Sequence, residues 1–184
     1  MKKILLISLL FTACAVGRAQ DRFLTRTGHI RFFSSAPLEN IQADNNQVTA
    51  VLDVVKGDIA FKVVMKSFEF QKAAMQDHFN TQYLHTDKYP NAEFEGRVTN
   101  LGAIDFKKDG TYPVQVAGKL TLHGVTNDIK QAGTVVVKGG NVSTNAKFNL
   151  ALADYNVKIP SDFTKKIAET VEVTVDCTLA PYTR

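Results

Sequence analysis

The sequence predicts an all-β fold, an antiparallel barrel of eight strands with one short helix. Three observations predict it: segments in which apolar and polar residues alternate, turn residues between these segments, and a single interval with helical spacing. About eight strands of this kind can close into a barrel, which removes exposed edges and can enclose one elongated ligand. A two-sheet sandwich is the alternative that the same pattern allows.

An export signal precedes the first strand. Lys2 and Lys3 are followed by an almost entirely apolar run over 4–16, and Gly17-Arg18-Ala19 supplies a small-residue cleavage site. The apolar run is too short to span a bilayer, which takes about 20 such residues. We therefore expect a signal peptide over 1–19 and one domain over 20–184.

The signal also predicts where the protein is found. A cleaved signal indicates export to the periplasm, with membrane association that is only transient. The alternative takes Phe11-Thr12-Ala13-Cys14 as a lipidation motif, so that a lipoprotein is anchored through Cys14. With the signal removed, Cys177 is the single remaining cysteine and can form no intramolecular disulfide.

Most of the basic excess belongs to the signal. The whole chain has 22 Lys and Arg against 18 Asp and Glu. Because Lys2, Lys3 and Arg18 lie within 1–19, the mature chain keeps 19 basic and 18 acidic side chains. This balance gives no electrostatic case for a nucleic-acid partner.

The strands are expected to begin with 21–33 and to end with 168–179. The last is the clearest, because its apolar side chains share one face and its polar side chains the other. The same alternation predicts strands near 59–66, 112–123 and 146–152. Turn signals are predicted at Asn45-Asn46, Lys56-Gly57-Asp58, Lys108-Asp109-Gly110 and Lys138-Gly139-Gly140-Asn141.

One interval departs from the strand pattern. Ala73, Ala74, Met75, His78 and Phe79 recur at helical spacing. The following Tyr89-Pro90 cannot continue a helix, because proline lacks an amide proton and restricts the residue before it. We expect a short helix over about 71–85 that packs against one end of the barrel.

Two stretches carry a resemblance to a known family: Lys88-Tyr89-Pro90-Asn91-Ala92-Glu93-Phe94 and Leu120-Thr121-Leu122-His123-Gly124-Val125-Thr126. With Gly28–Ser34 and Phe148–Tyr155 in the same order, the chain resembles the YceI-like family of periplasmic polyisoprenoid- and lipid-binding proteins over about 21–182. The resemblance implies an extended, lipocalin-like antiparallel β-barrel whose interior takes a long isoprenoid or fatty chain, without catalytic residues or a cofactor. It leaves a homodimer open.

We therefore expect a non-catalytic carrier for a polyisoprenoid, an isoprenoid quinone or a fatty acid or amide. A structural or envelope-interaction module with a filled barrel is the alternative. Phenylalanine side chains are the candidate lining of the cavity, although each also fits simple core packing. The candidates are Phe32, Phe61, Phe68, Phe70, Phe79, Phe94, Phe106 and Phe148.

The sequence gives little support for a metal site or for catalysis. The four histidines form no short cluster of the three or four ligands that zinc takes, so no metal site is expected. The sequence has no Gly-x-Ser-x-Gly elbow, and Cys177 is expected to face the core, where a thiol is inert. Head-group contacts could come from surface basic residues, with no single one preferred: Arg97, Lys107, Lys108, Lys119 and Lys130.

Overall fold

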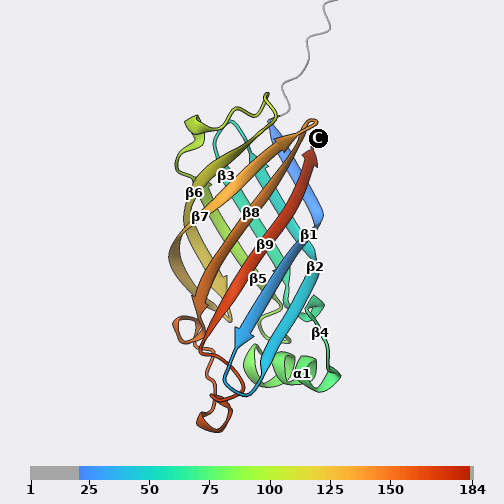
Figure 1. Cartoon of the computed structure of the whole chain (residues 1–184), viewed down its shortest axis with the longest axis vertical. Helices are drawn as coiled ribbons and strands as arrows, with labels where there is room; N and C mark the ends of the chain where they lie inside the picture. The colour runs from blue at the N-terminus through green and yellow to red at the C-terminus, as the bar shows by residue number, and fades with distance from the viewer. Residues whose placement is uncertain (1–20, 183–184) are drawn as a thin grey trace, which may run out of the picture.

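The computed structural model describes residues 21–182; the predicted signal peptide and Cys14 lie outside this range. Eight long strands form a closed antiparallel barrel (Figure 1), in the order β1-β9-β8-β7-β6-β5-β3-β2, and pairing of β1 with β2 closes it. The predicted barrel is confirmed and the sandwich is excluded. The strands are β1 Arg22–Ser35, β2 Asn40–Asp53, β3 Asp58–Val64, β5 Asn91–Val98, β6 Gly110–Leu122, β7 Val125–Lys138, β8 Asn141–Ala151 and β9 Thr170–Pro181.

The segment between β3 and β5 lies at the end of the barrel opposite the C-terminus (Figure 1). It contains the short strand β4, Glu69–Phe70, which pairs with β2, and the helix α1, Ala73–His78. A π-helical turn over Phe79–Tyr83 continues α1, so the predicted helix is confirmed, with 11 residues. The 3-10 turns are η1 Met65–Ser67, η3 Leu101–Ala103, η4 Leu152–Tyr155 and η5 Ser161–Phe163. Within 21–182, the structure contains no helix that is long and apolar enough to cross a membrane.

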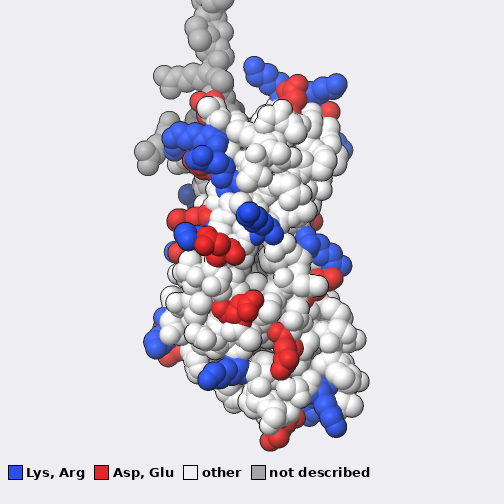
Figure 2. Space-filling view, turned by 90° about the vertical axis from the view of Figure 1, so that its left-hand side faces the viewer, with Lys and Arg blue, Asp and Glu red and all other residues white. Residues whose placement is uncertain are grey.

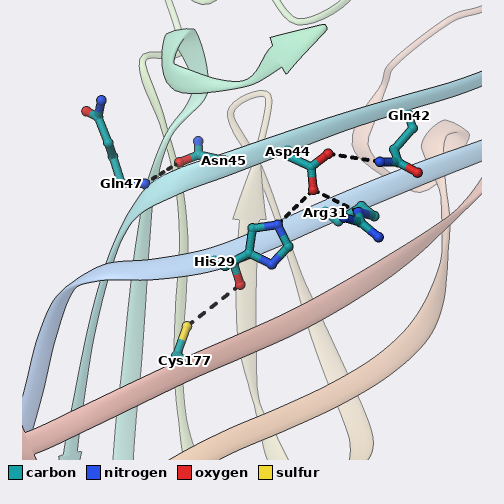
Figure 3. Close-up of polar contacts among 7 residues, drawn as sticks. All are labelled: His29, Arg31, Gln42, Asp44, Asn45, Gln47 and Cys177. Atoms are coloured by element: carbon teal, nitrogen blue, oxygen red, sulfur yellow. Dashed lines mark hydrogen bonds and ion pairs between the residues drawn. The ribbon is translucent and has the colours of Figure 1, made fainter. Parts of the chain in front are cut away.

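One predicted turn is wrong. Asn45-Asn46 lies inside β2, and the β1–β2 connection comes earlier, between Ser35 and Asn40. The register shifts beside Asn45, and the Asn45 side chain is fully buried. Its amide donates to the carbonyl oxygen of Val64 at 2.8 Å, and its side-chain oxygen accepts from the amide of Gln47 at 2.9 Å (Figure 3). The asparagine therefore stabilises a bulge, where it supplies hydrogen bonds that the ladder lacks.

Asp44, the neighbour of Asn45, organises the outer surface of β1 and β2 (Figure 3). It contacts Nε2 of His29 at 2.7 Å and accepts from Arg31 Nε at 2.7 Å and Gln42 Nε2 at 3.0 Å. Burial opposes ionisation of this carboxyl, but the hydrogen bonds from Arg31, His29 and Gln42 outweigh it and lower its pKa. His29 thus belongs to a polar network on the outer surface of the barrel.

Charges of both signs are interspersed on the outer surface shown in Figure 2. Several form pairs across adjacent strands. These are Lys62 with Glu93 at 3.3 Å, Arg97 with Asp58 at 2.8 Å, Lys119 with Asp128 at 3.1 Å and Lys147 with Glu172 at 2.9 Å. All are largely exposed, so each contributes little to stability, but together they keep the solvent-facing surface of the barrel polar.

Strands β5 and β6 approach closely where Gly96 pairs with Gly118. A Cβ atom on Gly118 would overlap the carbonyl oxygen of Glu95 and the Cα atom of Gly96. A glycine inside a strand often marks such a close approach of two backbones. The glycine pair therefore allows this approach within a continuous β5–β6 ladder.

Replacing Gly118 by alanine is therefore expected to lower the free energy of unfolding by about 1–3 kcal/mol, because the overlap is with backbone that cannot turn aside. Gly102→Ala is the matched control, since a Cβ there meets no atom within 4 Å. Urea denaturation followed by circular dichroism measures both. Equal stability of the two variants would contradict this account of the glycine pair.

Cys177 packs in the wall between β1 and β9. Its side chain is fully buried, and a Cβ on Gly28 would overlap its sulfur. The thiol lies 3.9 Å from the carbonyl oxygen of His29 (Figure 3). Burial raises the pKa of Cys177 to about 11, because the thiolate would lose its hydration.

Native Cys177 is therefore expected to resist alkylation at pH 8, where only about one thiol in a thousand is ionised. Because the folded-state pKa is raised, the stability that this group contributes is present below pH 9 and is lost as the pH rises toward 11. Iodoacetamide labelling with peptide mapping of Cys177 tests this, with protein in urea as control. Equally fast labelling of native and unfolded protein would show that the site is open.

Candidate functional site

The barrel encloses a cavity of about 480 Å³, within the size range of ligand pockets. Its wall is made mostly of inward-facing apolar side chains from the strands. Leu122 and Val114 of β6 both line it, and the eight-residue separation corresponds to about 27 Å of strand. At the usual strand tilt, the cavity is about 20 Å deep along the barrel axis.

Packed side chains close the cavity at the end of the barrel that holds the termini. Phe23, Leu52, Val137, Val142 and Leu179 are 0–6% exposed there, and they belong to the continuous core. These residues come from the ends of five strands that meet at this end. The barrel is therefore solid at one end and hollow toward the end that carries α1.

An aromatic cluster anchors the helical segment at the open end. The Phe32 ring on β1 lies 5.4 Å from Phe68, 5.7 Å from Phe70 and 5.7 Å from Phe79, between centroids. Phe68 and Phe79 are nearly buried, whereas α1 itself has no buried residue. The helix is thus held through Phe79 at its C-terminal end, while Ala74, Met75 and His78 on it line the mouth.

Seven of the eight phenylalanines singled out from the sequence line this cavity: Phe32, Phe61, Phe68, Phe70, Phe79, Phe94 and Phe148. Phe106 does not. It lies in the connection between β5 and β6, at the solid end, where it packs against the core instead. Its position in a loop, rather than in an alternating strand, is the reason that the pattern could not place it.

Strands β7 and β8 pair over only part of their length. Their ladder runs from Gly133 with Ala146 to Lys138 with Asn141, and in the described residues 125–132 of β7 and 147–151 of β8 have no partner across this seam. Gln131, Ala132 and Ala146 beside the seam line the cavity. The β7–β8 ladder is therefore incomplete in the hollow half of the barrel.

Side-chain bonds bridge the far end of this seam. Asn127 on β7 donates to the carbonyl oxygen of Asp154 in η4 at 2.7 Å. His123, in the β6–β7 turn with φ 50°, places Nδ1 3.1 Å from the carbonyl oxygen of Tyr155. His123 lies half-buried in this turn, and its ring centroid lies 4.7 Å from that of Tyr89. Over the described residues 21–182, no three His, Cys, Asp or Glu side chains are arranged to hold a metal ion.

The mouth carries charged residues that the sequence reasoning missed. Glu39, Lys72 and Lys166 line it from three separate loops, and Lys72 Nζ lies 2.8 Å from Glu39 Oε1. The basic residues that the sequence suggested do not line the cavity. Arg97 and Lys119 pair with carboxylates on the outer wall, and Lys107 and Lys108 lie in the β5–β6 connection at the solid end. Only the folded arrangement of loops identifies the mouth residues.

Comparison with known proteins agrees with this architecture. The family model of the YceI-like domain matches residues 22–179, and the chain belongs to that family. A polyisoprenoid-binding domain from Saccharophagus degradans, implicated in plant cell wall breakdown, has a similar structure with a TM-score of 0.76 and 16% identity. The similarity covers 88% of this chain and 99% of that one.

Two further structures are similar. BcnA of Burkholderia cenocepacia has a TM-score of 0.69 and 17% identity, over 83% of this chain and 96% of that one. The YceI protein of Campylobacter jejuni has a TM-score of 0.62 and 15% identity, over 80% and 88%. A comparison with curated protein sequences gives no significant match. At these identities the similar structures establish the fold alone.

Truncating a phenylalanine that anchors the helical segment is expected to lower the free energy of unfolding more than truncating one that borders the cavity. Phe79→Ala removes a nearly buried ring from the aromatic cluster and is expected to cost about 3–5 kcal/mol of stability. Phe148, half-buried beside existing empty space, is expected to cost less than half as much when truncated to alanine. Chemical denaturation of ligand-free protein compares them, and equal losses would contradict a hollow interior at Phe148.

Proposed function

We propose that the protein is an exported, non-catalytic carrier that holds one long apolar chain inside the barrel. The guest is a polyisoprenoid, an isoprenoid quinone or a fatty acid or amide. The observation that carries this proposal is the deep apolar cavity, solid at one end and open at the other. Likeness to a structure described as a polyisoprenoid-binding domain supports the same class of guest.

Binding in such a cavity needs no bond-making step. Removal of apolar surface from water contributes about 0.8 kcal/mol for each buried CH₂ group, so a long chain binds without dedicated polar contacts along its length. Each added CH₂ group should therefore tighten binding by about fourfold until the cavity is full. The length of the cavity then selects the length of the guest.

The cellular setting is part of the same proposal. The export signal supports cleavage after residue 19 and release into the periplasm, where the carrier shields its guest from water. In this setting contact with membranes is transient, and anchoring through Cys14 is the alternative.

Native mass spectrometry of protein purified gently from its own host tests both the presence of a bound guest and the cleavage of the signal peptide. We expect a mass that lacks residues 1–19, with an added guest of a few hundred daltons. Replacing Phe61, Phe94 and Phe148 by serine should remove the added mass, since all three border the cavity. Val55→Ser with Val64→Ser, which alters exposed side chains, is the control and should retain it.

Two outcomes would overturn parts of this proposal. A folded wild-type protein that never carries or takes up a long-chain lipid would exclude the carrier. A mature mass that retains Cys14 with added acyl groups would instead establish the lipoprotein and exclude free release.

A further inference from the structure

Charged side chains around the cavity are concentrated at its mouth. Among the described residues that line the cavity, the lysines and acidic residues are Glu39, Lys72, Glu93 and Lys166. Glu93 alternates with the inward-facing Phe94 on β5 and pairs with Lys62 on the outer surface. The other three lie in the loops at the open end, so the cavity has an apolar body and a charged rim.

The three rim residues are held together by contacts between separate loops. Glu39 ends the β1–β2 connection, Lys72 immediately precedes α1, and Lys166 follows η5. The Lys72 ammonium lies 2.8 Å from Glu39 Oε1. The amide of Leu38 donates to the carbonyl oxygen of Lys165 at 2.8 Å, which fixes the β1–β2 connection against the loop that carries Lys166.

The local charge at the rim is unbalanced in favour of the cations. The hydrogen bond from Lys72, with the nearby charges of Lys72 and Lys166, lowers the pKa of Glu39, so this carboxyl is ionised near neutral pH. One carboxylate thus faces two ammonium groups. The excess positive charge lies where the head of a guest inserted chain-first would come to rest.

We propose that Lys72 and Lys166 form a head-group subsite for an anionic guest, a long chain that ends in a carboxylate or a phosphate. The inference rests on the proposed carrier function and narrows its class of guest. Charge-assisted hydrogen bonds from the two ammonium groups to the anionic oxygens hold the head at the rim while the chain fills the apolar body. Glu39 positions Lys72 and disfavours a second anion.

The test compares guests that share one saturated chain and differ only in the head: a carboxylic acid, a monoalkyl phosphate and an alcohol. Kd values are measured by displacement of a fluorescent fatty probe at low salt. In the double variant Lys72→Gln with Lys166→Gln, the Kd for the acid or the phosphate should rise about tenfold, and that for the alcohol should stay within about twofold. The anion that loses more affinity identifies the preferred head.

The matched control removes the same charge elsewhere. Lys62→Gln with Lys147→Gln deletes two lysines that pair with carboxylates on the outer wall, and it should leave all three affinities unchanged. Loss of anion affinity in this control would show that the effect comes from net charge, and it would overturn the subsite. The subsite would also be overturned if the rim variant changed the Kd values for acid, phosphate and alcohol equally, or changed none of them.

The outcomes also separate the subsite from the carrier. A wild-type protein that binds the alcohol as tightly as both anions keeps the carrier and excludes the subsite. A wild-type protein that binds none of the three guests excludes both.

Discussion

Pairing of β1 with β2 closes the sheet, and the interior of the protein follows from that closure. A closed barrel has no outer edge strand, so every strand must direct one set of alternate side chains inward. At the end with the termini these side chains meet, and Leu52, Val142 and Leu179 are fully buried. Toward the other end the inward residues do not fill the interior, and they line a cavity of about 480 Å³.

The two stretches that carry the family resemblance lie side by side in the barrel wall. Phe94 of β5 pairs with Leu120 of β6, and the ladder leads to the turn at His123 and Gly124. Gly124 adopts a positive φ, and a Cβ there would collide with the ring of Tyr89. These residues shape the wall and the turn at the rim. Their contacts are structural, between two strands and between a turn and the ring of Tyr89.

Local pattern predicts the strands because alternation reports directly which face is buried. It predicts the inward set of β9, of which Val171, Val173 and Val175 line the cavity. It fails where a residue's role depends on distant contacts. Asn45 is typical of a turn, yet it is buried in a bulge because Val64 offers a carbonyl oxygen. Lys72 and Lys166, 94 positions apart, become neighbours of Glu39 only through loop packing.

The incomplete β7–β8 seam interrupts the hydrogen-bonded wall beside the cavity. Strand β7 is paired along its length with β6, and β8 is paired along its length with β9. Both strands are therefore hydrogen-bonded on the side that faces away from the seam. In the hollow half, contacts to η4 from Asn127 and His123 bridge the seam. The hydrogen-bonded ladder between β7 and β8 is therefore continuous toward the solid end and interrupted beside the cavity, where these side-chain contacts lie instead.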